Sequence, residues 1–405
     1  MPDSLDDEPQ RDAADSDLYC GYPYESELCP YDQYRSSGRT SRRERSYPAA
    51  QGTPPSGALR VIHVSSMMVP AGIDKWLTGL IRHADPRRLK FVRCVVTSEH
   101  VDWKQLVRVG VPVEIGGRDS VRRASEDCDV LLISDPGPNP NWVDDVRAKL
   151  CVIVAHGDGP WTRDRLECMA PVVHHVVAVS PRVQQAVCNG FPCTVIPNGV
   201  DPLHLTRSRP RDVVRASLGF RPGDFVLGFV GRFSPEKNPF AVIEAVARLP
   251  LHFKALMVGF GSLRDEVIDR ANELIPSRFT VVRGEDHVGD LYAAMDAFCL
   301  ASHSEGYGLV IMEAMMCGKP VIVGRVGFVP EAIADRVNGV VVPGDAGSIS
   351  EAAALLDAYP EWAATLGREA ARYAERHGYA STMAERYADL LDSLWSARAA
   401  NPSSG

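Results

Sequence analysis

Residues 297–323 read AFCLASHSEGYGLVIMEAMMCGKPVIV, and this stretch decides the fold class. An apolar run at 297–301 is followed by a glycine-rich loop, by an apolar helical segment and by a second apolar run at 320–323. Gly318 and Pro320 are typical of the end of that helix, because glycine suits the position after a helix and proline does not continue it. Two buried strands joined by a helix form a parallel pair. The stretch therefore predicts a strand–helix–strand unit of an α/β sheet.

The same alternation of short β-branched runs and amphipathic segments fills the chain from Leu59 onward. It predicts a first set of strands at 59–65, 91–97, 111–115, 130–133, 151–155, 176–179 and 194–196. After a polar, arginine-rich stretch at 201–224, it predicts a second set at 225–230, 254–258, 279–282, 297–301, 320–323 and 340–342. A helical tract at 349–398, broken near Pro360 and Gly378, closes the chain. Two Rossmann-like domains in series leave a cleft where the carboxyl edges of their sheets meet.

Composition narrows the functional classes. The chain has 405 residues, 45% of them hydrophobic and 24% charged, as in globular proteins of two domains. A net charge of −8 with no basic domain argues against a nucleic-acid partner. No signal-like segment and no apolar run of roughly 18 residues is present, which predicts a cytoplasmic protein. Small basic clusters at 87–90 and 118–123 leave peripheral contact with the inner face of a membrane open.

Two further compositional features lead to predictions. Ten cysteines occur without a C-x-x-C pair or zinc spacing, which predicts reduced thiols and no metal site. Residues 1–57 are acidic, lack apolar periodicity and contain six of the twelve tyrosines of the chain. We expect a disordered tail there, and composition leaves its role open.

The loop and helix at 304–315 carry the first candidate site. Glu305 precedes the helix and Glu313 lies inside it, so the two carboxylates occupy different points of one pocket. Gly306 and Gly308 allow the backbone to approach a ligand closely, and the free N–H groups at the start of the helix favour an anion.

A second candidate site, Gly231–Asn238, directly follows the predicted strand at 225–230. Arg232 and Lys237 place a guanidinium and an ammonium group at the carboxyl edge of the sheet. Such a pair offsets the negative charge of a diphosphate leaving group without a metal.

These motifs together resemble family four of the retaining glycosyltransferases, which have the GT-B fold. The resemblance covers about residues 58–400, and its motifs occur in family order. They are Ala71–Lys75, His156–Asp158, Val195–Asp201, Gly231–Asn238, Glu305–Glu313, Val329–Glu331 and Asn338-Gly339.

The resemblance implies a domain plan. An acceptor domain at 58–205 faces a nucleotide-sugar donor domain at 206–377 across the cleft. A C-terminal helix and short tail at 378–405 cross back to the first domain.

The resemblance also implies residue roles. Arg232 and Lys237 bind the donor diphosphate, and Glu313 binds the ribose hydroxyls. The other donor-binding residues it implies are Gly72, Glu305, Gly306, Tyr307, Gly308 and Leu309. His156 contacts the sugar near the reacting centre, so the catalytic set is Glu305, His156, Arg232 and Lys237. The nucleobase lies near residues 284–288, and Asp158, with Asp135, is a weaker candidate for acceptor contact.

The activity implied is metal-independent transfer, with no cofactor, of a hexosyl or N-acetylhexosaminyl group from a UDP- or GDP-sugar. The acceptor is a glycan, as in polysaccharide biosynthesis, or a lipid-linked or small molecule. Retention is attributed to same-face substitution in which the leaving phosphate oxygen takes the acceptor proton; a nucleophilic Glu305 is the alternative. Ala71-Gly72 and Gly327-Phe328 depart from glycine pairs common in the family, so the path of the phosphate loop and the shape of the sugar pocket stay open.

Two other functions are compatible with these motifs. The chain could be a catalytically silent nucleotide-sugar-binding scaffold, or a nucleotide-sugar 2-epimerase with the same architecture. The products of a reaction with nucleotide sugars separate these from a transferase.

Overall fold

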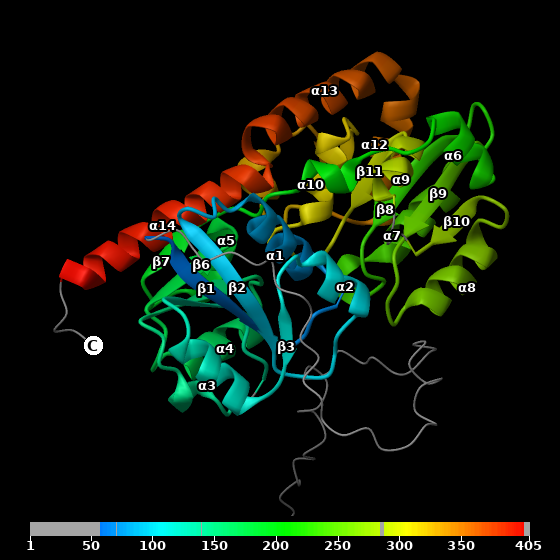
Figure 1. Cartoon of the computed structure of the whole chain (residues 1–405). Coiled ribbons are helices and arrows are strands. Elements are labelled where there is room, and N and C mark those ends of the chain that lie inside the picture. The colour runs from blue at the N-terminus through cyan, green and yellow to red at the C-terminus, as the bar shows by residue number, and fades with distance from the viewer. Residues whose placement is uncertain (1–56, 70, 139, 284–286, 401–405) are drawn as a thin grey trace, which may run out of the picture. The chain divides into compact units, whose positions relative to one another are not determined.

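The computed structural model describes residues 57–69, 71–138, 140–283 and 287–400 of the chain (Figure 1). Apart from Gly57, the predicted tail at 1–57 lies outside these residues. The described residues form two parallel sheets with helices between the strands, as the sequence predicts.

The first sheet has seven strands in the order β3-β2-β1-β4-β5-β6-β7. They are β1 (Leu59–Ser65), β2 (Leu89–Val96), β3 (Val113–Ile115), β4 (Val130–Asp135), β5 (Leu150–Ala155), β6 (His175–Ala178) and β7 (Cys193–Val195). The second sheet has six strands in the order β10-β9-β8-β11-β12-β13. They are β8 (Phe225–Val230), β9 (Phe253–Val258), β10 (Phe279–Val282), β11 (Ala297–Leu300), β12 (Val321–Val323) and β13 (Val340–Val341).

Both sheets reverse the direction of winding at one place, between β1 and β4 and between β8 and β11. In open parallel sheets, ligands bind outside the carboxyl ends of the strands at such a switch point. The topology alone therefore predicts that a ligand binds at the loops that follow these four strands.

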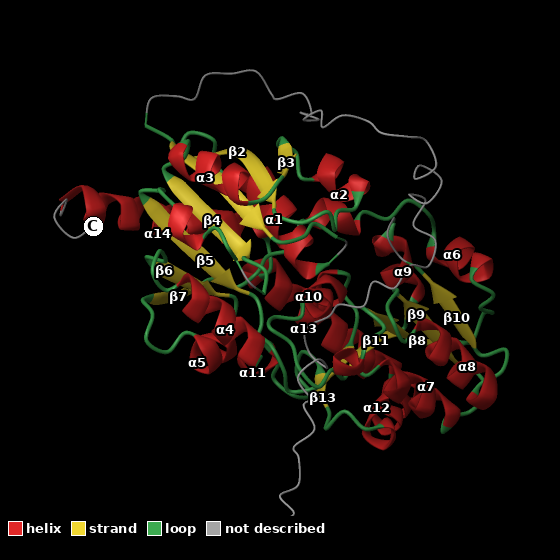
Figure 2. Cartoon of the chain, turned by 90° about the horizontal axis from the view of Figure 1, so that it is seen from below, coloured by secondary structure: helices red, strands yellow, loops and turns green. Residues whose placement is uncertain are grey.

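Helices cover the sheets (Figure 2). Those of the first half are α1 (Gly72–His83), α2 (Trp103–Arg108), α3 (Arg118–Glu126), η2 (Val143–Asp145), α4 (Pro160–Met169) and α5 (Pro181–Val187). Those of the second half are η3 (Pro202–Leu205), α6 (Arg211–Ser217), η4 (Pro235–Lys237), α7 (Pro239–Ala247), α8 (Arg264–Leu274), α9 (Val288–Ala294), α10 (Leu309–Met316) and α11 (Val329–Ala332). The chain closes with α12 (Ala346–Ala358), α13 (Pro360–His377) and α14 (Ala380–Ala400).

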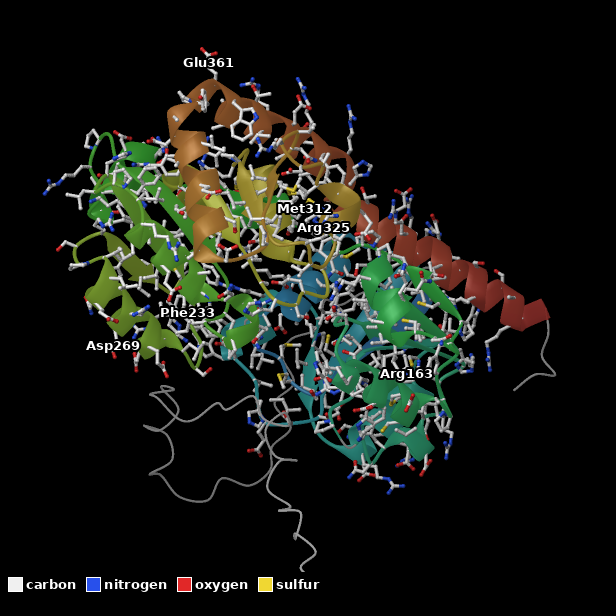
Figure 3. The ribbon with its side chains drawn as sticks, turned by 180° about the vertical axis from the view of Figure 1, so that it is seen from behind. Arg163, Phe233, Asp269, Met312, Arg325 and Glu361 are labelled. Atoms are coloured by element: carbon white, nitrogen blue, oxygen red, sulfur yellow. The ribbon has the colours of Figure 1, made fainter. Side chains whose placement is uncertain are left out.

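The C-terminal helices link the two halves. Helix α13 packs on α10, and Met312, labelled in Figure 3, lies against Gly378 at the end of α13. Helix α14 returns to the first sheet and packs on α1, where the rings of Tyr387 and Trp76 lie 5.8 Å apart. The predicted crossing back to the first sheet is confirmed.

Backbone hydrogen bonds fix this crossover at the turn after β7. An Asn-Gly pair after a strand is typical of positive φ, but neither Asn198 nor Gly199 has one. Gly199 is needed for space, because a Cβ atom there would lie 2.4 Å from the Tyr379 carbonyl oxygen. Val200 donates its N–H to Gly378 and accepts one from Ala380, which joins this turn to the α13–α14 junction.

The predicted strands agree with the observed ones to within two residues at either end. The breaks in the C-terminal helical tract also fall where proline and glycine predict them. The polar, arginine-rich stretch at 201–224 holds η3 and α6, and Val214 of α6 is buried. None of the helices in the described part of the chain is long and apolar enough to cross a bilayer. The domain boundaries stay predictions.

Candidate active site

The two loops at the switch point of the second sheet bring Lys237 and Glu305 together. The Lys237 ammonium lies 2.7 Å from Glu305 Oε2, and Ser302 donates its hydroxyl to Glu305 Oε1 at 2.9 Å. Glu305 is buried, whereas Lys237 keeps 23% of its side chain exposed. The partly exposed Lys237 ammonium is therefore held in place by the buried Glu305 carboxylate.

Asn238 fixes the loop that carries Lys237. Its φ of 52° is left-handed, a conformation that asparagine tolerates better than most residues. Its side-chain amide donates to the carbonyl oxygens of Ala301 and Gly344, at 3.2 and 3.1 Å. One hydrogen bond thus ties the end of η4 to the residue after β11, and the other ties it to the loop after β13.

Glu313 lies deeper, on α10, and both its carboxylate oxygens have partners. Lys75 of α1 lies 2.6 Å from Oε1, and the hydroxyl of the fully buried Tyr292 donates to Oε2 at 2.9 Å. Burial and the neighbouring carboxylate raise the pKa of Tyr292, so the phenol stays protonated as a donor. A carboxylate accepts about four hydrogen bonds, which leaves capacity for ligand hydroxyls.

The first turns of α1 and α10 converge. A Cβ atom on Gly72, the first residue of α1, would lie 3.8 Å from Leu309 Cδ1 at the start of α10. Gly308 precedes α10 with a φ of 97°, which a residue with a side chain would resist. Each helix start presents free N–H groups and the positive end of its dipole. Two anion-favouring ends, one beside each sheet, meet at this point.

His156 follows β5 and is held as a neutral imidazole. Burial lowers its pKa to about 3, and its Nε2 atom is buried with no hydrogen-bond partner in the described chain. Its ring lies edge-on to that of Trp76, with centroids 4.9 Å apart. An orphan polar nitrogen in a packed site is what a ligand hydroxyl would satisfy.

The loop after β11 is bonded directly to the first sheet's loops. A Cβ atom on Gly306 would lie 1.7 Å from the His156 carbonyl oxygen, so only glycine fits. Ser180 donates its hydroxyl to the Gly306 carbonyl at 2.8 Å. The Asp158 carboxylate accepts from Ser304 at 2.7 Å and pairs with Arg182. Glycine at 306 thus allows the loop after β11 to lie against the loop after β5.

Tyr307 faces away from solvent. It is buried and stacks on Phe328 with ring centroids 4.6 Å apart, and a Cβ atom on Gly327 would lie 2.2 Å from its carbonyl oxygen. The departure from a glycine pair at Gly327-Phe328 therefore places an aromatic ring behind the loop. Only the backbone of Tyr307 is left for a ligand.

The remaining predicted residues have different surroundings. Arg232 is half-buried beside Phe233 in the loop after β8. Asp135 is buried at the end of β4, where it pairs with Arg165 at 2.6 Å and accepts from Ser66. Residues 284–286 of the nucleobase prediction lie outside the described chain.

Sequence reasoning missed three residues that shape the site. Lys75 stands in a quoted motif, one turn after Gly72, but received no role. Tyr292 gave no signal, because a tyrosine in an apolar helix normally only fills the core. Ser180, after β6, becomes relevant only when the two sheets are seen together.

Comparison with known proteins shows which families and structures this chain resembles. Residues 210–372 match the model of the glycosyl transferases group 1. A D-inositol 3-phosphate glycosyltransferase from Segniliparus rotundus is 33% identical over 251 residues, 57% of this chain and 56% of that protein. The enzyme of that name from Mycolicibacterium smegmatis is 34% identical over 221 residues, 51% and 49% of the two chains. The chain thus spans about half the length of the curated relatives it matches.

Solved structures resemble the chain over most of its length. Anabaena Alr3699/HepE, in complex with UDP and glucose, aligns with a TM-score of 0.73 at 22% identity, over 83% of this chain and all of that one. WaaG, described as a glycosyltransferase involved in lipopolysaccharide biosynthesis, aligns with a TM-score of 0.62 at 16% identity, over 82% and 99%. At these identities the likeness shows the fold. The chain has the GT-B fold, and its residues 210–372 match the family model of the glycosyl transferases group 1.

Proposed function

We propose that the protein is a glycosyltransferase that takes a hexosyl or N-acetylhexosaminyl group from a nucleotide diphosphate sugar, UDP or GDP. The observation that carries this is the meeting of two helix N-termini, at Gly72 and Leu309, next to the loop of Glu305, which pairs with Lys237 of the neighbouring loop. A diphosphate is the group that two such ends and a cation recognise. The name of Anabaena Alr3699/HepE, crystallised with UDP and glucose, supports the same donor class.

Residue roles follow from the contacts. Lys237 and Arg232 bind the diphosphate and offset the charge that develops on it as the glycosidic bond breaks. Glu313, held by Tyr292, accepts from the ribose hydroxyls. Neutral His156 accepts or donates one hydrogen bond at the sugar, and its pKa of about 3 makes it a poor acid at neutral pH.

The chemistry proposed is metal-independent and needs no cofactor, because Lys237 and the helix N-termini supply the positive charge. The C1–O bond to the diphosphate breaks, the acceptor hydroxyl oxygen bonds to C1 on the same face, and its proton passes to the leaving phosphate oxygen. Same-face substitution, and membership of family four, rest on the resemblance of the motifs. Glu305 positions the sugar in this scheme, since its carboxylate is engaged by Lys237 and Ser302.

The acceptor is proposed to enter over the carboxyl edge of the first sheet. Asp158 supports this, because Ser304 bonds it beside Glu305. The names of the inositol phosphate relatives favour a hydroxyl-rich small molecule, with glycans and lipid-linked sugars as the other classes. A cytoplasmic location and peripheral membrane contact stay predictions.

A panel of UDP-, GDP- and ADP-sugars tests the proposal. Release of free nucleotide with transfer of the sugar to an added acceptor is expected for at least one donor. Binding without turnover for every donor would instead favour a silent scaffold, and isomerised nucleotide sugars would favour an epimerase.

A further inference from the structure

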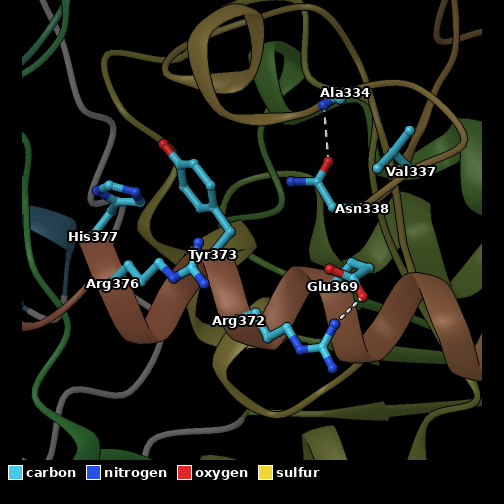
Figure 4. A pocket seen from close by; sticks show the side chains of 8 residues that line it. All are labelled: Ala334, Val337, Asn338, Glu369, Arg372, Tyr373, Arg376 and His377. Carbon is cyan, nitrogen blue, oxygen red and sulfur yellow. Dashed lines mark hydrogen bonds and ion pairs between the residues drawn. The ribbon is translucent and has the colours of Figure 1, made fainter.

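A hollow of about 320 Å³ lies between α13 and the loop that follows α11, outside the candidate active site (Figure 4). This volume is at the low end of the range for small-molecule pockets. The residues that line it are Ala334, Val337, Asn338, Glu369, Arg372, Tyr373, Arg376 and His377.

The residues that line this hollow carry more positive than negative charge. Arg372 and Arg376 stand one helical turn apart on α13, where like charges repel. Glu369 pairs with Arg372, whereas Arg376 has no hydrogen-bond or ion-pair partner in the part of the chain that the structure describes. His377 follows on the same side, its ring 4.7 Å from that of Tyr373. Arg376 is exposed, and a bound anion would offset the repulsion between the two guanidinium groups.

The walls of the hollow are already formed. Opposite α13, the Asn338 side chain accepts from the Ala334 N–H at 2.8 Å (Figure 4). The same side chain donates to the Ala332 carbonyl at 2.9 Å. The loop is therefore held by its own hydrogen bonds, and a ligand need not order it. A preformed wall lowers the cost of binding.

We propose that this hollow is a regulatory site for a small soluble phosphate monoester. A phosphate dianion matches two guanidinium groups, because their N–H donors pair with its oxygens. The volume admits the phosphate and a few more heavy atoms, which fits a metabolite of the size of glycerol 3-phosphate.

Both walls of the hollow connect to residues 307–316, which form the end of the glycine-rich loop and helix α10. From the loop wall the chain runs back through α11 to Phe328, which stacks on Tyr307. From the other wall, α13 packs on α10, with Gly367 so close to Gly318 that a Cβ atom would lie 2.3 Å from its carbonyl oxygen. An anion that joins the two walls therefore restrains both ends of residues 307–316.

Calorimetric titration of the full chain with inorganic phosphate and with glycerol 3-phosphate, in a phosphate-free buffer, tests the site. Arg376→Gln should weaken binding by at least about tenfold, as expected for loss of a charge-assisted hydrogen bond. Arg368→Gln is the matched control, because Arg368 is exposed on the same helix and donates only to Thr365. It should leave the affinity unchanged.

The candidate active site is the competing place for an anion. Binding that is lost in Lys237→Ala but kept in Arg376→Gln would put the phosphate there and overturn the proposal. Absence of binding by the unmodified chain would overturn it too. Neither result depends on the glycosyltransferase assignment, because no turnover is measured.

Two further measurements test whether the ligand is a soluble phosphate or a lipid headgroup, and whether its binding affects residues 307–316. Sedimentation with phosphatidic acid vesicles should show no dependence on Arg376; an Arg376-dependent pellet, with no binding of soluble phosphate, would contradict a metabolite. Glycerol 3-phosphate should slow amide hydrogen exchange of residues 307–316 by at least about fivefold in the unmodified chain. An equal slowing in Arg376→Gln would contradict coupling through the hollow.

Discussion

Removal of one buried hydroxyl group, in Tyr292→Phe, tests whether Glu313 binds the donor. The Tyr292 hydroxyl lies 2.9 Å from Glu313 Oε2, and both side chains are almost fully buried. Without it, one carboxylate oxygen loses its donor and only Lys75, 2.6 Å from the other oxygen, still orients the group. A hydrogen bond to a charged group contributes about 1.5–3 kcal/mol, and part of this loss falls on folding.

We therefore expect the KM for the donor to rise about tenfold, equivalent to about 1.4 kcal/mol, with kcat nearly unchanged. Initial rates of nucleotide release over a range of donor concentrations give both constants. Tyr387→Phe is the matched control, because Tyr387 is buried on α14 against Trp76 and does not contact Glu313. An unchanged KM in folded Tyr292→Phe, or a fall in kcat alone, would refute the role of Glu313 in ground-state donor binding.

Three other perturbations have defined outcomes. Lys237→Ala should lower kcat on the order of 100-fold, because the leaving diphosphate loses its cation; undiminished turnover in a rapid-mixing assay would refute that role. Gly306→Ala should lower kcat/KM roughly 100-fold with little change in the urea midpoint, because its Cβ atom would meet the His156 carbonyl at 1.7 Å and displace the loop. Burial lowers the pKa of both His63 and His156 to about 3, while unfolded imidazoles take up protons below about pH 6.5. These two histidines should thus lower the free energy of unfolding by about 2.5 kcal/mol from pH 7 to pH 5.5, and His156→Gln should remove about half of that contribution, as urea titrations at each pH would show.

The sequence was a good guide to the fold because parallel strands buried on both faces read as unbroken apolar runs. Phe225–Val230, a central strand that is buried at every residue, was predicted without error for this reason. Helix α6 was missed because it is charged and mostly exposed, with only Val214 and Arg215 buried, so it carries little periodicity.

The candidate site was predictable where residues follow a strand along the chain. Lys237 and Glu305 each stand after a strand at the switch point, and their pairing follows from the topology. The contacts of Glu313 were not predictable, because Lys75 approaches from the other sheet and Tyr292 from a different helix. The reason for glycine at 199 was not predictable either, since close approach by residue 379 leaves the same sequence signal as positive φ.

A crystal structure of the full chain with an unhydrolysed nucleotide sugar would show whether the two helix N-termini bind a diphosphate. We expect the diphosphate at the first turns of α1 and α10, within hydrogen-bond distance of Lys237, with the ribose hydroxyls on Glu313. A nucleotide bound at any other place, or ribose hydroxyls with no contact to Glu313, would contradict it.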